Sequence, residues 1–420
     1  MSRCAQNYGD VVALKGLVPS YLFNHPDAVE QILVSEHASF RKSEFVKIIR
    51  PLLGNGLLLS EGDFWKQQRH LIQPAFHRKR IATYARTMVD YCEKMLDSWQ
   101  FGQVRDIHQE MMSLTLAIVA KTFFGSDLES DIETIERAVT LMLHQSDRRS
   151  QNALLFYLPD AVPTPDNLRL RRAIKRLDEM VYRLVNERRR VEKTTGESSD
   201  DLLSMLLNMQ AEDGSRMSDR QVRDEVNTFL LAGHETTALV LSWAWYLLGR
   251  HPEIAEKLAA EVKTVLKGRS PTLSDLAQLP YTEWIVLETM RLYPPVWLLG
   301  RAVVKDCEIG GYELKRGLTV LTSAWVVHRD PRWFQSPEKF IPERWANDFA
   351  KQLPSFAYFP FGGGPRVCIG QAFAMMESRL LLATIAARYR LKLTASNPIT
   401  PWPSLSLRPR EPVRMLLEKR

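Results

Sequence analysis

A glycine-rich stretch, Phe361-Gly-Gly-Gly-Pro-Arg-Val-Cys-Ile-Gly370, places one cysteine in a turn just before a predicted helix. The stretch matches neither phosphate-binding pattern, G-x-x-x-x-G-K-[ST] or G-x-G-x-x-G, and it follows no clear strand. Zinc would need three or four neighbouring Cys or His ligands, and no papain-like or caspase-like signature surrounds Cys368. A single thiolate fits better, because the amides at the start of a helix can stabilise its charge. Haem iron accepts one axial thiolate of this kind.

Five residues of this stretch occupy all the fixed positions of the signature F-x-x-G-x-R-x-C-x-G, namely Phe361, Gly364, Arg366, Cys368 and Gly370. The chain therefore resembles the cytochrome P450 family, and the motifs described below follow that family's order over nearly the whole length. The resemblance implies that the cofactor is haem b and that Cys368 is the axial ligand of its iron.

A second motif, Ala232-Gly-His-Glu-Thr-Thr237, lies inside a long predicted helix. The zinc pattern H-E-x-x-H fails here, because the second histidine position is Ala238. Glycine weakens the middle of a helix and Thr hydroxyls can bond carbonyls one turn back, so we expect a local kink. The motif is similar to the family's A-G-x-[DE]-T-[TS]. That resemblance implies that Thr236 hydrogen-bonds the oxygen being activated and that Glu235 relays protons toward it.

Two further sets of residues are implied by the resemblance. A buried Glu288 between Arg291, one turn along, and Arg344 of Pro-Glu-Arg-Trp345 would stabilise the core, although Trp345 replaces the family's usual Phe. The haem propionates need cations or hydrogen-bond donors, and the residues expected to supply them are Trp65, Arg69, Arg301 and Arg366.

The substrate pocket is expected, by family position, to be lined from residues 45–59, 229–230, 297–299 and 402–405. These segments are mostly apolar and carry no evident charged clamp. A hydrophobic molecule, like a fatty acid, a terpenoid or a polyketide, is therefore favoured over a polar one. The individual residues expected to line the pocket are Phe45, Phe229, Trp297, Leu298 and Trp402.

The elements that must position these residues are mainly helical. Apolar residues recur at three-or-four spacing, and Ser218 with Gln221 forms a capping-box signature at the start of the longest helix. Helices are predicted over 26–34, 63–73, 78–100, 106–124, 130–143, 167–191, 218–249, 253–267, 281–292 and 371–389, and short strands over 10–18, 20–23 and 301–321. We expect a mainly α protein with a small β-rich part, in the cytochrome P450 fold. Because distant motifs must meet at one haem, we expect one domain, 1–420, with a short N-terminal segment before the first strand.

Composition narrows the remaining classes. The chain has 420 residues, and 56 Lys and Arg against 49 Asp and Glu give a net charge of +7. Basic clusters are short and lack interleaved aromatic residues, which argues against nucleic-acid binding. Apolar runs fall short of the ~18–20 residues that span a bilayer, no signal peptide is evident, and the four cysteines form no disulfide framework. A cytoplasmic location is therefore expected.

No reductase region is evident, so electrons are expected from a ferredoxin or flavodoxin with its reductase. Such partners are acidic, and they would dock near the helix that carries Lys66 and Arg69. The function expected is a monooxygenase that inserts one atom of O₂ into a hydrophobic substrate. Two alternatives stay open at this point: a peroxide-driven or isomerising haem-thiolate enzyme, and a non-enzymatic haem sensor or carrier.

Overall fold

The computed structural model describes residues 1–15, 18–128, 131–196, 198–210, 216–394 and 397–420. Contacts group the chain into two compact units. Unit 1 comprises Met1–Glu44, Met88–Met111 and Thr236–Arg420, and unit 2 comprises Phe45–Thr87 and Met112–Glu235. Three helices contribute residues to both units: α6 (Ala85–Asp97), α7 (Ile107–Phe124) and α12 (Asp219–Arg250).

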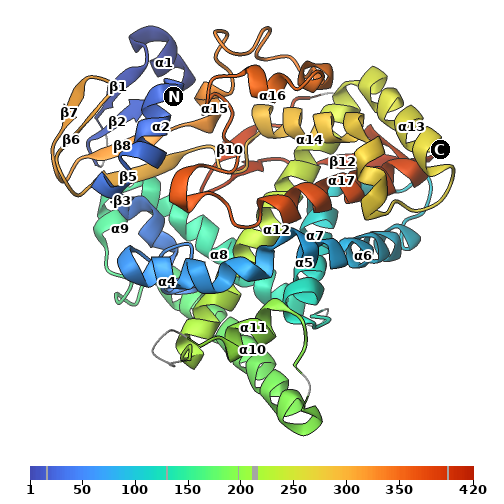
Figure 1. Ribbon diagram of the computed structural model, residues 1–420, viewed down its shortest axis with the longest axis horizontal. Coiled ribbons are helices and arrows are strands. Elements are labelled where there is room, and N and C mark those ends of the chain that lie inside the picture. Colours follow the sequence, from blue (N-terminus) through green and yellow to red (C-terminus); the bar gives the residue numbers. More distant parts are fainter. Residues whose placement is uncertain (16–17, 129–130, 197, 211–215, 395–396) are drawn as a thin grey trace. The chain divides into compact units, whose positions relative to one another are not determined.

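All the strands of the described residues lie in unit 1, and five of them form one mixed sheet (Figure 1). In this sheet β2 and β8 are parallel, with Ser20 opposite Thr319, and the other pairs are antiparallel. One face of the sheet packs against helix α2 through buried apolar residues that include Phe23, Val29 and Val320. The order across the sheet is β1 (Val11–Leu14), β2 (Ser20–Phe23), β8 (Thr319–Thr322), β5 (Leu299–Val303) and β3 (Phe40–Lys42).

The remaining strands of unit 1 are short and antiparallel. They form the sheet β4 (Val104–Asp106), β12 (Arg414–Lys419) and β9 (Tyr389–Leu393), and the pairs β6 (Cys307–Ile309) with β7 (Tyr312–Leu314) and β10 (Pro401–Pro403) with β11 (Leu407–Pro409). The helices of unit 1 are α1 (Ser2–Tyr8), α2 (Pro26–Glu30), α13 (Pro252–Leu266), α14 (Pro280–Leu292), α15 (Ala324–Val327), α16 (Phe349–Gln352) and α17 (Gln371–Arg388).

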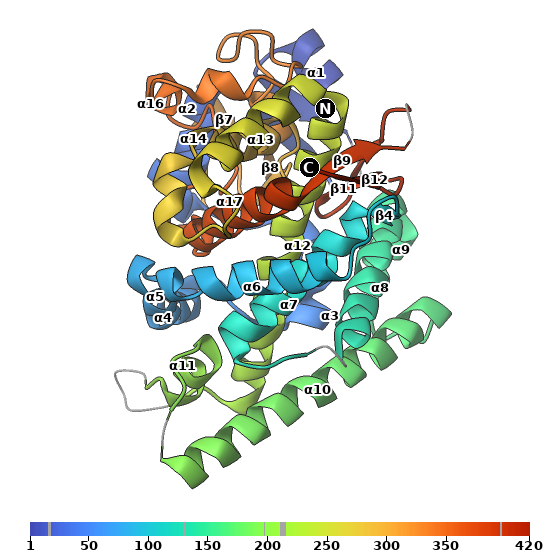
Figure 2. The same cartoon turned by 90° about the vertical axis from the view of Figure 1, so that its right-hand side faces the viewer.

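Helix α17 packs against α13 and α14 in unit 1 (Figure 2). Its residues 380–386 are all buried. A helix that is buried on all sides has no polar face, which is why α17 reads as apolar in sequence. It begins directly after Gly370, so the cysteine loop is attached to a fixed part of the core.

Unit 2 is helical in its described residues. Helix α10 packs along α8 with an apolar stripe that includes Leu170, Leu177 and Leu184 (Figure 2). It begins where Pro165 follows Thr164, whose hydroxyl accepts a hydrogen bond from the amide of Asn167 at 3.1 Å. The helices of this unit are α3 (Arg50–Leu53), α4 (Gly62–Ile72), α5 (Arg78–Thr83), α8 (Ile132–Gln151), α9 (Ala153–Tyr157), α10 (Pro165–Thr195) and α11 (Leu202–Asn208).

The prediction of a mainly α fold with a small β part is confirmed, with differences in detail. The single helix predicted over 78–100 is wrong: it is divided at Tyr84, whose amide bonds the carbonyl of Ile81 at 3.0 Å and whose ring packs near Phe123. The helix predicted over 26–34 continues beyond Glu30 as a π-helical turn. Helices α1, α9 and α11 and strands β9 to β12 were not predicted, because they are short and carry little periodicity.

Within the described residues, no helix combines the length and the apolar character that crossing a membrane would require.

Candidate active site

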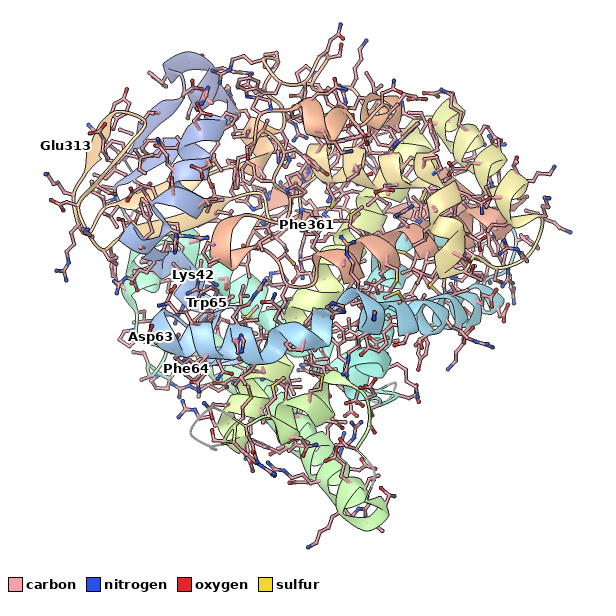
Figure 3. The ribbon with its side chains drawn as sticks, in the orientation of Figure 1. Lys42, Asp63, Phe64, Trp65, Glu313 and Phe361 are labelled. Atoms are coloured by element: carbon pink, nitrogen blue, oxygen red, sulfur yellow. The ribbon has the colours of Figure 1, made fainter. Side chains whose placement is uncertain are left out.

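The loop before α17 holds Cys368 through backbone hydrogen bonds. The amide of Cys368 donates to the carbonyl of Phe361 at 3.0 Å, and the amide of Val367 donates to the carbonyl of Gly364 at 3.1 Å. Figure 3 labels Phe361 at the start of this loop. The residue Cys368 is exposed, whereas Cys92 is buried and Cys4 and Cys307 are partly covered. The backbone bonds thus fix the loop, and the Cys368 side chain lies at its exposed surface.

Glycine is required at position 364 for two reasons. Its φ is +64°, a region that residues with a side chain rarely adopt. A Cβ atom at this position would also lie 1.9 Å from the carbonyl oxygen of Leu33, so the loop could not pack against the η1 turn (Gln31–Ser35). The fixed glycine of the motif therefore sets the position of the cysteine loop in unit 1.

The oxygen-activation motif lies in the middle of α12. Helix α12 is unbroken from Asp219 to Arg250, so the expected kink is not a break in the helix. Instead, the hydroxyl of Thr115 on α7 donates to the carbonyl of His234 at 3.1 Å, inside unit 2. Glu235 is buried, whereas Ala232 is exposed and Thr236, one turn later, is half-buried. The helix surface around Ala232 and Thr236 is therefore partly exposed.

Glu288 is the centre of an ion cluster in unit 1, in which Glu288 and Arg291 are fully buried. Both of its oxygens accept bonds from Arg291, at 2.8 and 2.9 Å, and Arg344 Nε donates to Oε1 at 2.9 Å. The indole Nε1 of Trp345 donates to Oε2 at 2.9 Å. Trp345 thus adds a hydrogen bond that a phenylalanine at this position could not make.

A buried histidine connects this ion cluster to the segment before the cysteine loop. Arg291 donates to the carbonyl of His328 at 2.9 Å, and the amide of Phe359 donates to His328 Nε2 at 2.9 Å. Burial, with the nearby charges of Arg291 and Arg329, lowers the pKa of His328 to about 3. The imidazole is therefore neutral and able to accept the amide of Phe359. The sequence offered no motif that would have identified His328.

The residues predicted to hold the propionates lie in both units. Trp65 and Arg69 are half-buried, one turn apart on α4 of unit 2, and Figure 3 labels Trp65. In unit 1, Arg301 lies in β5 opposite Lys42 of β3, and Arg366 lies in the cysteine loop; both side chains are half-buried.

The residues predicted to line the substrate pocket have different surroundings. In unit 2, the ring of Phe45 packs at 5.2 Å from that of Phe156, and Phe229 is buried with its ring stacked at 5.4 Å from that of Phe76. In unit 1, the indole of Trp297 donates to the carbonyl of Ser404 at 2.8 Å. Leu298 packs against the buried residues Val12, Leu22 and Leu321, and Trp402 in β10 carries Arg410 over its ring.

A cavity of about 370 Å³ lies in unit 2, lined by Asn55, Phe64, Ser218, Arg220, Gln221, Asp224 and Glu225. The backbone amides of Asn55 and Leu57 donate to carboxyl oxygens of Asp224 and Glu225, at 2.8 and 3.0 Å. These bonds attach the predicted pocket segment 45–59 to the first half of α12. Burial, reinforced by the neighbouring charge of Asp224, raises the pKa of Glu225 to about 8.

This raised pKa predicts a pH dependence of stability. The folded state holds a proton on Glu225 up to about pH 8, whereas the unfolded state releases it near 4.5, so the contribution of Glu225 to stability falls as the pH rises between these values. We expect the free energy of unfolding of Glu225→Gln, compared with that of wild type, to be higher at pH 8.5 than at pH 4.5. The expected change in this difference between the two pH values is a few kcal/mol, on the order that such a pKa shift implies. Denaturant unfolding at several pH values measures this difference. The exposed Glu187→Gln is the control, and parallel curves for Glu225→Gln and wild type would contradict the prediction.

These residues fit a haem group. A loop fixed by backbone bonds, with one exposed cysteine at the start of a helix, is the ligand arrangement of a haem-thiolate protein. Residues 1–417 match the family described as Cytochrome P450. The chain therefore belongs to the cytochrome P450 family.

Relatives that are named as oxygenases support the same class. The chain is 38% identical over 417 residues to the cyclooctatin synthase of Streptomyces melanosporofaciens, covering 98% of this chain and 89% of that relative. It is 39% identical over 388 residues to the cyclooctat-9-en-7-ol 5-monooxygenase of the same organism, covering 92% and 83%. It is 33% identical over 399 residues to the pentalenene oxygenase of Streptomyces avermitilis, covering 94% and 87%.

The protein is thus a haem-thiolate monooxygenase that uses haem b and inserts one atom of O₂ into a hydrophobic organic substrate. It depends on redox partners for electrons. The similarity to a monooxygenase and an oxygenase favours this activity over the peroxide-driven, isomerising and non-enzymatic alternatives.

Proposed function

We propose that the substrate is a terpenoid-like hydrocarbon or its alcohol. The observation that carries this proposal is the identity of 38% to a cyclooctatin synthase and of 39% to a cyclooctat-9-en-7-ol 5-monooxygenase. The mostly apolar segments predicted to line the pocket support it. Incubation of the reduced enzyme with cyclooctat-9-en-7-ol, pentalenene or lauric acid tests the class. A product with one added oxygen atom from either of the first two supports the proposal, and turnover of lauric acid alone would contradict it.

Cys368 would hold the haem iron, while Trp65, Arg69, Arg301 and Arg366 would bind the propionates by hydrogen bonds and charge. The group supplies the oxygen chemistry when it is bound. The chain contributes the axial sulfur and the fixed loop around it. That loop runs from Phe361 to Gly370. The hydrogen bond from the Cys368 amide to the Phe361 carbonyl supports the assignment of this loop as the one that holds the cofactor.

Thr236 and Glu235 would manage the protons that oxygen activation needs. The Thr236 hydroxyl would position water and donate a hydrogen bond, and the Glu235 carboxyl would exchange a proton with that water. The half-burial of Thr236 beside the buried Glu235 supports this division of roles.

This division predicts the effect of Thr236→Ala. We expect the variant to keep its haem and to consume reductant at a rate similar to wild type. Much more of the reducing equivalents should be released as hydrogen peroxide, because the hydroxyl that positions the proton-donating water is missing. Simultaneous assays of reductant, product and peroxide measure this. Thr384→Ala, a buried threonine in α17, is the control; an unchanged ratio of product to peroxide in Thr236→Ala would count against the assigned role.

The partner would be a ferredoxin or flavodoxin, each with its reductase, attracted by the net charge of +7. Lys66 on α4 and Lys79 on α5 are exposed, and the contact of Lys66 with Asp63 at 2.9 Å is itself an exposed surface pair. Arg80 is less suitable, because its guanidinium is paired with Asp200.

Charge reversal tests this docking surface. We expect Lys66→Glu with Lys79→Glu to slow reduction by a ferredoxin about tenfold at low salt and to weaken the salt dependence of the rate, because electrostatic steering is lost. Stopped-flow reduction measures the rate. A control with the same net charge replaces the exposed Lys392 and Lys263 by Glu. Equal rates in the two double variants would argue against docking at Lys66 and Lys79.

The whole chain, 1–420, would act as one catalytic domain in the cytoplasm. The family match across residues 1–417 and the sharing of α12 between the two units support a single domain. Four cysteines in 420 residues are too few for a disulfide framework, which is compatible with a reducing compartment.

A further inference from the structure

In unit 2, side chains of α12 hold the backbone of a segment that is distant in sequence. The Nδ2 amide of Asn227 donates to the carbonyl of Leu52 at 3.2 Å, and the amide of Leu57 donates to Glu225 Oε2 at 3.0 Å. All four residues are buried. Buried backbone groups need hydrogen-bond partners, and here α12 supplies them. We call residues 52–57, which end α3 and lead toward α4, the anchored segment.

The carboxylate of Asp224 is held from two sides. Its Oδ2 accepts the amide of Asn55 at 2.8 Å, and its Oδ1 accepts a bond from Arg223 at 2.9 Å. Arg223 also donates to Asp178 of α10 at 2.6 Å. Arg223 and Asp224 are buried, and charge-assisted hydrogen bonds of this kind are short and strong. The anchored segment therefore takes its position from a carboxylate that α10 and α12 fix together.

The anchored segment also lies directly against the backbone of α12. A Cβ atom at Gly56 would lie 2.2 Å from Oγ1 of Thr228 and 2.6 Å from the carbonyl oxygen of Asp224. The Thr228 hydroxyl bonds that same carbonyl at 2.8 Å, so both atoms are held in place. Glycine is required at position 56 by this close approach. A single added methyl group would separate the segment from the helix.

A short turn joins the anchored segment to α4. The amides of Leu59 and Ser60 both donate to the carbonyl of Gly56, each at 2.9 Å, and α4 begins at Gly62. Helix α4 carries Trp65, one of the residues predicted to bind the propionates (Figure 3). The position of the anchored segment on α12 therefore also sets where α4 begins.

We propose that Asp224, Glu225 and Asn227 are positioning residues that set one wall of the substrate pocket and the start of α4 through the anchored segment. The segment belongs to the stretch 45–59 that is predicted to line the pocket. An apolar pocket discriminates between substrates largely by its shape, and a displacement of about 1 Å can weaken a reaction about a hundredfold. This inference rests on the substrate class proposed above, and the three residues lie outside the recognised motifs.

Hydrogen exchange of the oxidised holoenzyme tests the anchoring without using turnover. Because the pKa of Glu225 is raised to about 8, its carboxyl is protonated at pH 7. Glu225→Gln then keeps an oxygen for the Leu57 amide, whereas Glu225→Leu keeps a similar volume without an acceptor. We expect the amides of 52–61 to exchange about tenfold faster in Glu225→Leu than in wild type, and at the wild-type rate in Glu225→Gln. The exposed Glu187→Leu is the control, and equal protection in Glu225→Leu and wild type would overturn the proposal.

Gly56→Ala tests the same contact from the side of the segment. Its methyl group would meet Thr228 and the backbone of α12, so we expect faster exchange over the same amides although no side chain of α12 is changed. Gly268→Ala is the control, because a Cβ atom there meets no atom of the described residues within 4 Å. Wild-type exchange over 52–61 in Gly56→Ala would contradict the close fit on which the proposal stands.

The binding of two ligands tests the pocket wall. Cyclooctat-9-en-7-ol, which would fill the pocket, and imidazole, a small ligand of the iron itself, are titrated into the oxidised holoenzyme while the Soret band is followed. We expect Glu225→Leu to bind the terpenoid alcohol about tenfold more weakly than wild type and imidazole equally well, because only the larger ligand depends on the shape of the wall. Glu225→Gln should match wild type for both ligands. Equal weakening of both ligands in Glu225→Leu, or of neither, would refute the role in specificity.

Failure of the proposed substrate class is distinguishable from failure of this inference. If the alcohol leaves the Soret band of the wild type unchanged, the substrate class is wrong, while the exchange rates still decide whether Glu225 anchors the segment. If the alcohol binds wild type and Glu225→Leu equally well, the substrate class stands and the anchored segment does not set the pocket wall.

Discussion

Cys368→Ser is expected to abolish the thiolate-shifted Soret band of the reduced carbon monoxide complex and, with it, monooxygenase activity. The serine hydroxyl stays protonated at neutral pH and cannot replace the electron-donating thiolate. The backbone bond from residue 368 to Phe361 does not involve the sulfur, so the loop should keep its conformation. Absorbance spectra of the reduced protein, with and without carbon monoxide, measure the effect.

Cys4→Ser is the control for this variant, because Cys4 is a partly covered thiol in the same unit. It should keep the band at full intensity. If Cys368→Ser retained the thiolate band, or if Cys4→Ser lost it, the assignment of Cys368 as the axial ligand would be wrong.

Glu288→Ala is expected to have the largest effect on stability, about 3–5 kcal/mol, because it leaves two buried arginines without their carboxylate. It also removes the acceptor for the indole of Trp345. Because Arg291 also holds the carbonyl of His328, and His328 holds Phe359, we expect haem loss to accompany the destabilisation. Denaturant unfolding of the holoenzyme and its haem content measure the two effects.

Glu256→Ala is the matched control on α13, where the carboxylate is largely exposed and forms distant pairs with Arg390 and Arg420. Such surface pairs contribute about 0–1 kcal/mol. Glu288→Gln should fall between the two, since an amide retains the size but not the charge. A loss no larger for Glu288→Ala than for Glu256→Ala would contradict the role of the buried cluster.

Sequence motifs predicted the family, the fold class and the cofactor. Cys368 and the glycines around it stand at a fixed spacing, and such a spacing can be recognised without knowing the secondary structure of the loop. The Glu288–Arg291 spacing was informative for the same reason. Helix boundaries were less predictable: the apolar pattern over 78–100 continues smoothly through Tyr84, and the local turn there depends on a contact with Phe123 from another helix.

The residues that sequence reasoning missed act through burial. Glu377 belongs to no motif, and its complete burial becomes evident once α17 is packed in the core of unit 1. His328 is a lone histidine whose neutrality depends on Arg291 and Arg329, which come together with it in the folded chain. A hydrogen bond from Trp345 to Glu288 likewise follows from packing.

The reduced carbon monoxide difference spectrum of the wild-type holoenzyme tests the central claim most directly. With Cys368 as a thiolate ligand, the Soret band should appear at the shifted position characteristic of haem-thiolate proteins and should account for the bound haem. A band at the position of a histidine-ligated or thiol-ligated haem, in protein that is folded and haem-loaded, would contradict the assignment of Cys368.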